Sequence, residues 1–426
     1  MKILIIGGGI AGNEVAALLA GQNGMELTIL SAESHPEYDP CSLPYYVGGV
    51  ISRNAVFRKN RSFYEKAGIK LVLDSPVVTI NSTLKTVTTI RGEEYPYDRL
   101  VLAHGGSLFI PPIPGIDQQG VFSCKSLDEA DRLAGGGGGR AVVIGSGAIG
   151  VEVAEALKRR DCEVTIVEVL PWILPALFDE PGGRLMERAL ADLGIRVFTS
   201  ERVQTITGNG KVSGVVTDRR EIPCDTVVIA TGVIPGKALA ETAGLATGRG
   251  ILVDDRMSTS VEDIYACGDC VETPDACTGE LGLYQLKHNA IDQARVVARN
   301  ILGREIRYPG GYVFARVHFF DTHGVTFGKS VRSLSCEPSS LRIMETTKDR
   351  DYLRIILKDE MIVGGQAIGR FADLTGPLMA AMWRREKVGP LLNGSAEKTP
   401  PLSSFPWLRR GGSGLFGSPG DLNRPL

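Results

Sequence analysis

The chain has 426 residues, enough for about three domains at a usual size of roughly 150 residues each. Its composition, 43% hydrophobic and 23% charged residues, excludes wholesale disorder. With 47 Lys and Arg against 49 Asp and Glu, the net charge of −2 offers no basic field for nucleic acid or anionic lipid. The apolar runs are too short to cross a bilayer, and eight cysteines without disulfide-like spacing favour free thiols in a reducing cytoplasm.

The start of the chain predicts a dinucleotide site. MKILII is an expected buried strand, the loop GGGIAG follows it, and EVAALLA continues as a helix. The fingerprint glycines, which allow close approach to a diphosphate at a helix N-terminus, are Gly7, Gly9 and Gly12. The next expected strand, LTILS, ends at Ser31, where an acidic ribose ligand is usual. We expect Glu33, two residues further on, to bind the ribose instead, with Ser31 as the alternative.

The same pattern recurs in the middle of the chain. Residues 140–144 are an expected strand, the loop GSGAIG follows, and VEVAEALKRR is an expected helix. The fingerprint glycines of this copy are Gly145, Gly147 and Gly150. The next strand, EVTIVE, ends in Glu168, whose carboxylate accepts from ribose hydroxyls and repels a 2′-phosphate, so this site should prefer NAD(H) to NADP(H). One fingerprint alone is weak evidence, but two complete copies with correct flanks are strong.

Three further segments complete a recognisable order. DRLVLAHGG and DTVVIATG are matching strand-plus-glycine exits, and VEDIYACGDC follows them. From residue 1 to about residue 303, these five motifs resemble the FAD- and NAD-dependent pyridine nucleotide–disulfide oxidoreductase superfamily. The resemblance implies that the first fingerprint binds FAD and the second binds NAD(H). It also implies that Gly268 and Asp269 hold the flavin ribityl chain, while His104 replaces the threonine usual in the first exit.

The resemblance implies an α/β fold with two Rossmann-like domains, a smaller α+β C-terminal interface domain and an irregular tail. The expected limits are an FAD domain over 1–110 and 245–308, an inserted NAD domain over 111–244, an interface domain over 312–393 and a tail over 394–426. Within the interface domain, DYLRIILK and MIVGGQAI read as strands and LTGPLMAAMWRREKV as a helix. The five glycines at 135–139 read as a flexible joint into the NAD domain.

Two residues are candidates for catalysis. Cys41, in YDPCSLPYY, resembles the single cysteine that lies over the flavin in coenzyme A disulfide and persulfide reductases. A thiolate there can take part in disulfide or persulfide cleavage, whereas a buried free cysteine acts only as a small hydrophobe. Glu152, after the second loop, resembles the residue that orients the nicotinamide or flavin edge in the family. Its alternative is an acid favoured by the dipole of a helix's first turn.

Other residues carry weaker expectations. The helix after Lys287 and His288 can stabilise negative charge on the reduced flavin, although a solvated charge pair is equally compatible. Asn13 is expected to be no more than a first-turn residue of a helix. Cys267 and Cys270 form a CxxC, but the two residues between them belong to the FAD motif, so we interpret the spacing as incidental. Without a second CxxC or paired histidines at ligand spacing, we expect no metal site.

The sequence leaves two acceptors open. Ile10 stands where oxygen- and peroxide-reducing members of the subgroup carry a histidine, which argues against that chemistry. The C-terminal part lacks a YYPG-like stretch and resembles NAD-linked flavin subunits found beside carbon monoxide dehydrogenases and tungsten aldehyde oxidoreductases. One hypothesis is therefore an FAD-containing flavin subunit that exchanges electrons with an iron–sulfur partner in a hetero-oligomer, with the tail along that partner. The alternative is a stand-alone homodimeric NADH-dependent coenzyme A disulfide or persulfide reductase that uses Cys41.

Overall fold

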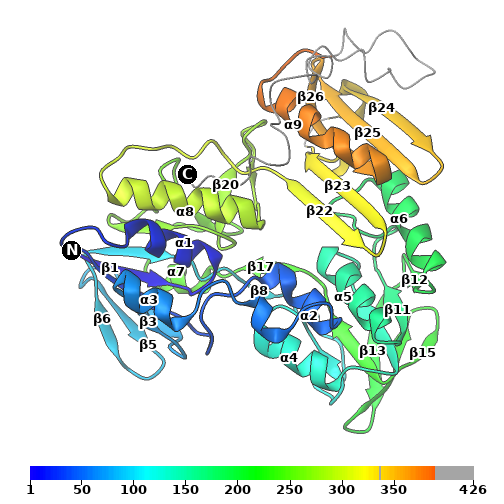
Figure 1. Cartoon of the computed structure of the whole chain (residues 1–426), viewed down its shortest axis with the longest axis horizontal. Coiled ribbons are helices and arrows are strands. Elements are labelled where there is room, and N and C mark those ends of the chain that lie inside the picture. Colours follow the sequence, from blue (N-terminus) through cyan, green and yellow to red (C-terminus); the bar gives the residue numbers. More distant parts are fainter. Residues whose placement is uncertain (335–336, 389–426) are drawn as a thin grey trace, which may run out of the picture. The chain divides into compact units, whose positions relative to one another are not determined.

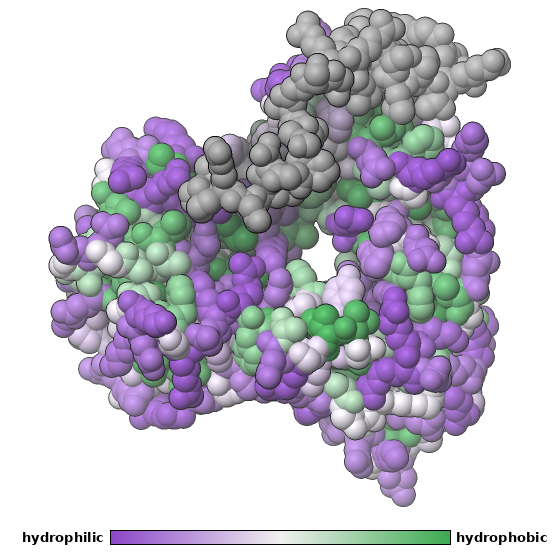
Figure 2. Space-filling view, in the orientation of Figure 1, coloured by the Kyte–Doolittle hydropathy of each residue, from purple (hydrophilic) through white to green (hydrophobic). Residues whose placement is uncertain are grey.

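The computed structural model describes residues 1–334 and 337–388 (Figure 1). These residues form two compact units, which we describe separately. The first contains Met1–Ala176 and Met186–Val313, and the second contains residues 177–185 and the described residues from Phe314 onward. No helix among the described residues is both long and apolar enough to cross a membrane. Hydrophilic residues cover most of the described surface visible in Figure 2, with smaller hydrophobic areas between them.

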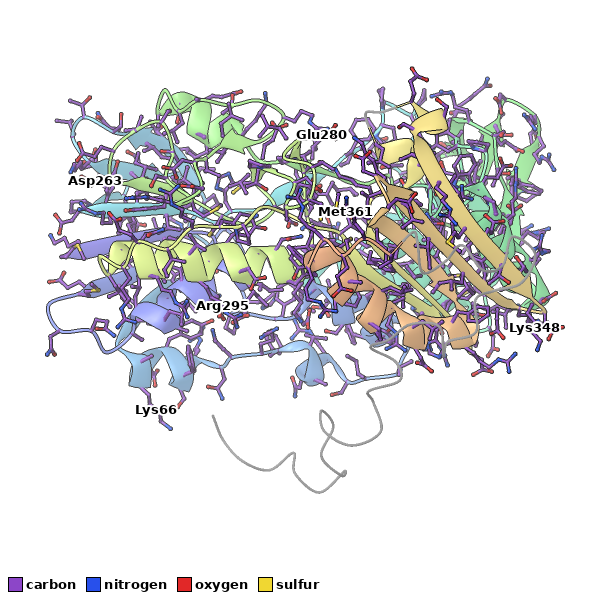
Figure 3. The ribbon with its side chains drawn as sticks, turned by 90° about the horizontal axis from the view of Figure 1, so that it is seen from above. Lys66, Asp263, Glu280, Arg295, Lys348 and Met361 are labelled. Carbon is purple, nitrogen blue, oxygen red and sulfur yellow. The ribbon has the colours of Figure 1, made fainter. Side chains whose placement is uncertain are left out.

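A five-stranded parallel sheet carries the first glycine loop. Its strands, in spatial order, are β19 (Ile264–Ala266), β7 (Arg99–Leu102), β1 (Lys2–Ile6), β2 (Glu26–Leu30) and β3 (Ile69–Val72). The central strand is buried on both faces, which explains its continuous apolar run. Helices α1 (Ile10–Leu19) and α8 (Lys287–Ile301) pack against each other, and the Arg295 side chain of α8 forms an ion pair with Glu14 of α1 (Figures 1 and 3).

Shorter elements complete this half of the first unit. An antiparallel sheet is formed by β4 (Val77–Asn81), β5 (Thr86–Thr89) and β6 (Glu94–Pro96). The remaining elements are α2 (Leu43–Val47), α3 (Arg61–Ala67), α7 (Ala238–Thr242), β18 (Ile251–Leu252), β20 (Val271–Pro274) and β21 (Leu281–Gly282). Ala240 and Ala243, at α7, belong to the same buried cluster as β1.

The second glycine loop lies in a sheet with the same plan. Its strands, in spatial order, are β12 (Arg196–Phe198), β11 (Glu163–Val167), β10 (Arg140–Ile144), β16 (Thr226–Ile229) and β9 (Val121–Phe122). The helices are α4 (Leu127–Gly136), α5 (Ala148–Arg159) and α6 (Glu180–Asp192), and an antiparallel sheet comprises β13 (Val203–Gly208), β14 (Val212–Thr217) and β15 (Glu221–Pro223). The crossover strands β8 (Gly106–Leu108) and β17 (Val233–Pro235) pair with each other. Two Rossmann-like halves therefore share one α/β plan, as the sequence predicts.

The prediction of a flexible joint at residues 135–139 is wrong. Gly135 and Gly136 are the last residues of α4, and the N–H of Gly137 caps this helix on the carbonyl of Leu133. Gly138 exchanges two hydrogen bonds with the hydroxyl of Thr226 in β16. Strand β9, which precedes the glycines, already belongs to the second sheet. These glycines therefore belong to the second Rossmann-like half, because their backbone groups form hydrogen bonds within α4 and with β16.

The second unit contains an antiparallel sheet, helix α9 (Thr375–Trp383) and the first residues of α6. Its strands, in spatial order, are β22 (Phe314–Phe319), β23 (Thr322–Gly328), β26 (Met361–Ile368), β25 (Asp351–Lys358) and β24 (Leu341–Lys348). The two predicted strands agree with β25 and β26. Helix α9 is shorter than the predicted segment because Arg385 adopts a positive φ of 52°, which a continuing helix cannot accommodate.

Candidate functional site

The first glycine loop is built for close backbone contact. A Cβ atom at Gly7, which has φ +114°, would lie 2.3 Å from the carbonyl oxygen of Ala103, and one at Gly12 would lie 2.1 Å from the carbonyl oxygen of Gly7. A Cβ at Gly9 would meet no atom within 4 Å, so this residue faces away from the protein. The loop also leads directly into the N-terminus of α1. These features fit a dinucleotide diphosphate.

The FAD motif near residue 268 lies against this loop. A Cβ at Gly268, which has φ +85°, would lie 3.1 Å from the Cβ of Ala11 in α1. The Gly268 N–H donates to Oε1 of Gln293 in α8, at 2.8 Å. Burial raises the pKa of Asp269, and the charge of Lys125 opposes that shift. Gly268, the neighbour of Asp269, thus lies against both α1, which follows the first fingerprint, and α8, an arrangement that fits an FAD site.

The expected ribose ligand is ambiguous in the structure as well. Ser31 is buried beneath the loop, with its Oγ 2.8 Å from where a Cβ of Gly8 would stand. Glu33 is half-buried, and its Oε2 accepts a hydrogen bond from the hydroxyl of Tyr38 at 2.6 Å. The backbone N–H of Glu33 donates to Oγ of Ser31 at 3.2 Å. The two residues are therefore neighbours, and the assignment of Glu33 to the ribose stays a prediction.

The second loop repeats this geometry around a buried carboxylate. Cβ atoms at Gly145 and Gly150 would collide with the carbonyl oxygens of Ala230 and Gly145, whereas one at Gly147 would meet no atom within 4 Å. Glu168 is buried at the end of β11.

Three hydrogen bonds hold the Glu168 carboxylate beneath the loop. It accepts from the N–H of Ser146 at 2.8 Å, from the hydroxyl of Ser146 at 2.6 Å and from the N–H of Leu170 at 2.8 Å. This placement, beside a diphosphate loop and at the end of the second strand, suits the recognition of an adenosine ribose.

Cys41 lies in a charged setting. The carboxylate of Asp39 accepts from the Cys41 N–H at 3.2 Å and pairs with the ammonium of Lys287, the first residue of α8, at 2.5 Å. Cys41 is exposed to solvent by area, yet surrounding protein reduces the solvation of its thiolate. This burial, with the charges of Asp39 and Glu152, raises the pKa of the Cys41 thiol to about 11, although Lys287 opposes the shift. These surroundings favour the protonated thiol over the thiolate.

Glu152 occupies the first turns of α5, after the second loop. Burial, with the nearby charge of Glu155, raises the pKa of Glu152 to about 7. Its charge also acts on the thiols of Cys41 and Cys124. Glu152, which follows the second loop, is therefore near enough to Cys41 for its charge to act on that thiol, and its raised pKa allows it to hold or release a proton near neutral pH.

The comparisons with known proteins agree with this geometry. The family model for pyridine nucleotide-disulphide oxidoreductase matches residues 1–294. The chain is 31% identical over 428 residues to an NADH oxidase of Methanocaldococcus jannaschii, covering 95% of this chain and 96% of that protein. This chain belongs to the pyridine nucleotide-disulphide oxidoreductase family. It is an enzyme, an NAD(H)-dependent flavin oxidoreductase, and its cofactors are FAD and NAD(H).

Two further relatives differ in the acceptor that their names give. A rubredoxin-NAD(+) reductase of Ectopseudomonas oleovorans is 32% identical over 316 residues, which are 72% of this chain and 82% of that protein. The structure of an NAD-dependent persulfide reductase from A. fulgidus has 32% sequence identity and a TM-score of 0.86, and the match covers 94% of this chain and 80% of that one. Family membership therefore establishes the cofactors and leaves the acceptor as a separate question.

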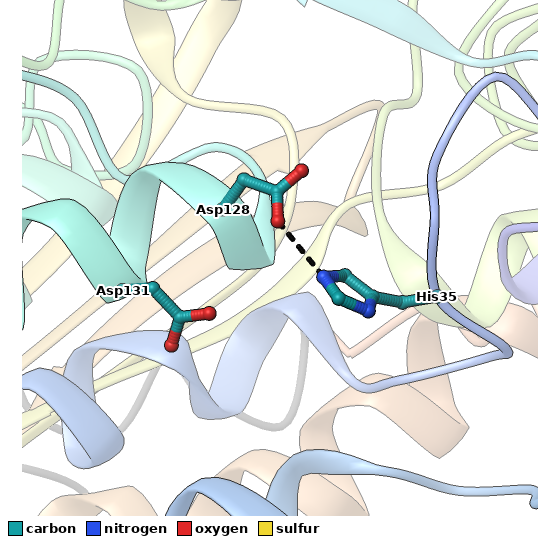
Figure 4. A group of neighbouring side chains, drawn as sticks. All are labelled: His35, Asp128 and Asp131. Carbon is teal, nitrogen blue, oxygen red and sulfur yellow. Dashed lines mark hydrogen bonds and ion pairs between the residues drawn. The ribbon is translucent and has the colours of Figure 1, made fainter. Parts of the chain in front are cut away.

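Sequence reasoning missed the residues that join the two halves of this flavin oxidoreductase. The hydroxyl of Tyr38 donates to Glu33 and accepts from the backbone N–H of Leu127 at the start of α4. Figure 4 shows the neighbouring group, in which Nε2 of His35 lies 2.8 Å from a carboxylate oxygen of Asp128. The segment that carries Cys41 is thus fixed to the first turn of α4. No local pattern signals these contacts, because each partner is some 90 residues away.

The three side chains in Figure 4, His35, Asp128 and Asp131, carry atoms that can bind a metal ion, but their carboxylates already pair with protein groups. The ligand atoms of His35, Asp128 and Asp131 lie within 4.8 Å of one another. However, the guanidinium of Arg53 pairs with both oxygens of Asp131 at 2.7 to 3.0 Å, and the hydroxyl of Tyr46 donates to the same carboxylate. Arg53 lowers the pKa of Asp131. A cation would have to displace this guanidinium, so we interpret the group as a structural link.

The CxxC of the FAD motif lies in the core. Cys267 and Cys270 are fully buried free thiols, and burial raises the pKa of both. The thiol of Cys270 lies 3.3 Å from the carbonyl oxygen of Cys267 and 3.5 Å from that of Leu102. A buried protonated thiol is a poor nucleophile, which favours the incidental interpretation of this spacing.

Proposed function

We propose that this flavin oxidoreductase is the flavin subunit of a hetero-oligomer and exchanges electrons between NAD(H) and an iron–sulfur partner. The observation that carries the proposal is the environment of Cys41. The ammonium of Lys287, which favours a thiolate there, is already paired with Asp39, and burial together with Asp39 raises the pKa of the Cys41 thiol. This setting disfavours the thiolate through which a thiol–disulfide reductase works. The rubredoxin-NAD(+) reductase relative supports the same class of acceptor.

FAD, when bound, supplies the conversion between hydride transfer and single-electron transfer. The residues of this chain provide the remaining requirements. The first loop and Asp269 would hold FAD, the second loop and Glu168 would hold NAD(H), and Glu152 lies where it can take up or release a proton. The N-terminus of α8, with Lys287 as its first residue, offers positive potential for negative charge on the flavin.

A second function is supported by a different feature of the same residue. Cys41 is exposed by area, and the neighbouring ammonium of Lys287 favours its thiolate. The similarity to an NAD-dependent persulfide reductase covers 94% of this chain. This alternative is a stand-alone homodimeric reductase of coenzyme A disulfide or persulfides in which Cys41 is the redox thiol.

One experiment separates the two functions. The FAD-loaded protein is reduced anaerobically with NADH and is then mixed with oxidised rubredoxin, coenzyme A disulfide or glutathione persulfide. We expect rubredoxin reduction at an equal rate in the parent and in Cys41→Ser, because no thiolate is needed for electron transfer to iron. Cys162→Ala, which removes a buried thiol beyond the C-terminal end of α5, is the matched control. If the parent rapidly reduces coenzyme A disulfide or glutathione persulfide and Cys41→Ser abolishes that reaction, the alternative function is supported instead.

Several expectations stay predictions. The tail over 394–426, with its expected contact to a partner, lies outside the described residues. The domain limits, the hetero-oligomer and the cytoplasmic location also await tests. Copurification from the native host would test the assembly, since an iron–sulfur subunit in fixed proportion supports the first function and a homodimer supports the second.

A further inference from the structure

A buried chain of hydrogen bonds supports the inner side of the first glycine loop. Asn13, which is 1% exposed, donates from its amide nitrogen to the carbonyl oxygen of Gly8 at 2.7 Å and to that of Gly9 at 3.1 Å. Its Oδ1 accepts from the hydroxyl of Tyr64 at 2.8 Å, and that hydroxyl accepts from the backbone N–H of Glu37 at 3.2 Å. Each group thus donates to the next, and the series ends at the loop.

The direction of this chain matters for diphosphate binding. A loop that points its N–H groups at a diphosphate has carbonyl oxygens that need donors elsewhere. Aligned hydrogen bonds polarise one another, so the chain from Glu37 strengthens the donors that hold these carbonyls. The Tyr64 hydroxyl also fixes which amide atom of Asn13 faces the loop, because it donates to Oδ1.

The second loop meets the same need with a different donor. Its residue equivalent to Gly8 is Ser146, whose carbonyl oxygen accepts from the backbone N–H of Leu174 at 2.9 Å. The position equivalent to Asn13 is Val151, which is fully buried and has no polar side-chain group. The asparagine is therefore not a general feature of helices that follow such loops in this protein. It supplies what a backbone amide supplies in the other half.

The far end of the chain reaches the segment that carries Cys41. Glu37 is buried, and its carboxylate pairs with the ammonium of Lys59 at 2.9 Å and the guanidinium of Arg58 at 3.2 Å. The ammonium of Lys59 also donates to the carbonyl oxygen of Asn13 at 3.4 Å. Lys59 thus links Glu37 back to Asn13. Three segments that are distant in sequence, those of Asn13, Glu37 and residues 58–64, therefore hold the loop in one conformation.

We propose that Asn13 is a positioning residue for FAD, acting through the carbonyl groups of Gly8 and Gly9, and that Tyr64 sets its orientation. Asn13 preorganises the diphosphate loop, so that FAD binds without having to order the backbone. The proposal concerns the binding of FAD and does not depend on which electron acceptor the protein uses.

The test compares FAD affinity with the stability of the protein without FAD. In Asn13→Leu, which keeps the size of the side chain and removes its donors, the FAD dissociation constant should rise about tenfold, because the carbonyl group of Gly8 loses its donor while that of Gly9 keeps the backbone N–H of residue 13. Tyr64→Phe should raise it about fivefold, since a single hydrogen-bond chain is interrupted. Both constants are measured by the change in flavin fluorescence on reconstitution of the apoprotein.

Two controls define the mechanism. Tyr97→Phe removes a buried hydroxyl of the same domain that has no hydrogen-bond partner among the described residues, and it should change the FAD dissociation constant less than about twofold. The NADH dissociation constant should stay unchanged in both Asn13→Leu and Tyr64→Phe, because the second loop has its own donor. The unfolding midpoint of each apoprotein is recorded in parallel.

If Asn13 had a purely structural role, its replacement would lower the stability of the apoprotein and leave FAD affinity unchanged. If Asn13→Leu lowers the midpoint of the apoprotein while FAD affinity stays at the parent value, the proposal is wrong. It is also wrong if Tyr64→Phe and Tyr97→Phe have equal effects on FAD affinity. Should Asn13→Leu fail to fold, the comparison of the two tyrosine variants decides alone.

Discussion

Glu152 gives a prediction that links stability to the candidate site. Burial and the neighbouring Glu155 raise its pKa to about 7 from an ordinary value of 4.5. The folded protein therefore binds the proton of Glu152 more tightly than the unfolded chain does. Replacing Glu152 by Gln keeps the shape and removes the charge, so the variant isolates the cost of ionising this half-buried carboxyl.

The sign and size follow from proton linkage. Between pH of about 4.5 and 7 the folded state binds more protons at this group than the unfolded state, so the free energy of unfolding falls as pH rises through this window. Above it the full penalty is present and amounts to about 3 kcal/mol at most, at roughly 1.4 kcal/mol per pH unit of displacement. Glu152→Gln should escape this penalty, so its advantage over the parent grows from nothing near pH of about 4.5 to its full size above about 8.

The assay is thermal unfolding of the FAD-loaded parent and variant across this pH range. Differences between variants are compared, because a multidomain flavoprotein need not unfold in two states. Glu201→Gln is the matched control, since the Glu201 carboxylate is buried in the same half but paired with Thr217 and Arg220, so the loss of its charge should destabilise the protein. If the difference in thermal stability between Glu152→Gln and the parent does not change with pH, the reasoning is refuted.

Three other residues yield predictions. Glu168→Gln should narrow the preference for NADH over NADPH about tenfold or more in stopped-flow bleaching of the flavin, because a carboxylate no longer faces the 2′-phosphate; equal bleaching by both nucleotides in the parent would contradict this. Lys287→Met should raise the pKa of Cys41, because Lys287 lowers it, so the pH profile of thiol alkylation should move upward, whereas Lys59→Met should leave it in place. The purified protein should carry one non-covalent FAD per chain, and Asp269→Leu should weaken its retention; a folded colourless parent would oppose both statements.

The sequence predicted the repeated part of the fold well, for a physical reason. Parallel strands buried on both faces read as continuous apolar runs, and a glycine loop before a helix marks the end of the central strand. Strand β10 therefore agrees with its predicted limits. The antiparallel strands β25 and β26 agree with theirs as well, and every residue of β25 except the last is buried. The end of α9 and the glycines at 135–139 were predicted less well, because tertiary hydrogen bonds and a positive φ at Arg385 decide them.

The fingerprint residues of the site could be predicted, whereas the residues that support them could not. Gly7 and Glu168 belong to local patterns of known spacing. The role of Asn13 depends on Tyr64, which is 51 residues away, and the neighbours of Cys41 include Lys287, which comes from α8. Pair contacts of this kind leave no periodic signal in a single sequence. The choice between Ser31 and Glu33 is not decided by the structure either, since the Ser31 side chain lies beneath the first loop and the Glu33 carboxylate is bonded to Tyr38.

The two halves of the fold differ most in how they support their loops. The first loop is held by a hydrogen-bond network of Asn13, Tyr64 and the backbone N–H of Glu37, which come from three separate segments, so its conformation depends on the tertiary structure of this half. The second loop is held by Glu168 and by backbone groups within about 30 residues of it. A loop fixed by a buried network suits a group that remains bound through many reaction cycles. A loop supported by short-range contacts suits a nucleotide that must enter and leave in each cycle, which is the division of work that FAD and NAD(H) require.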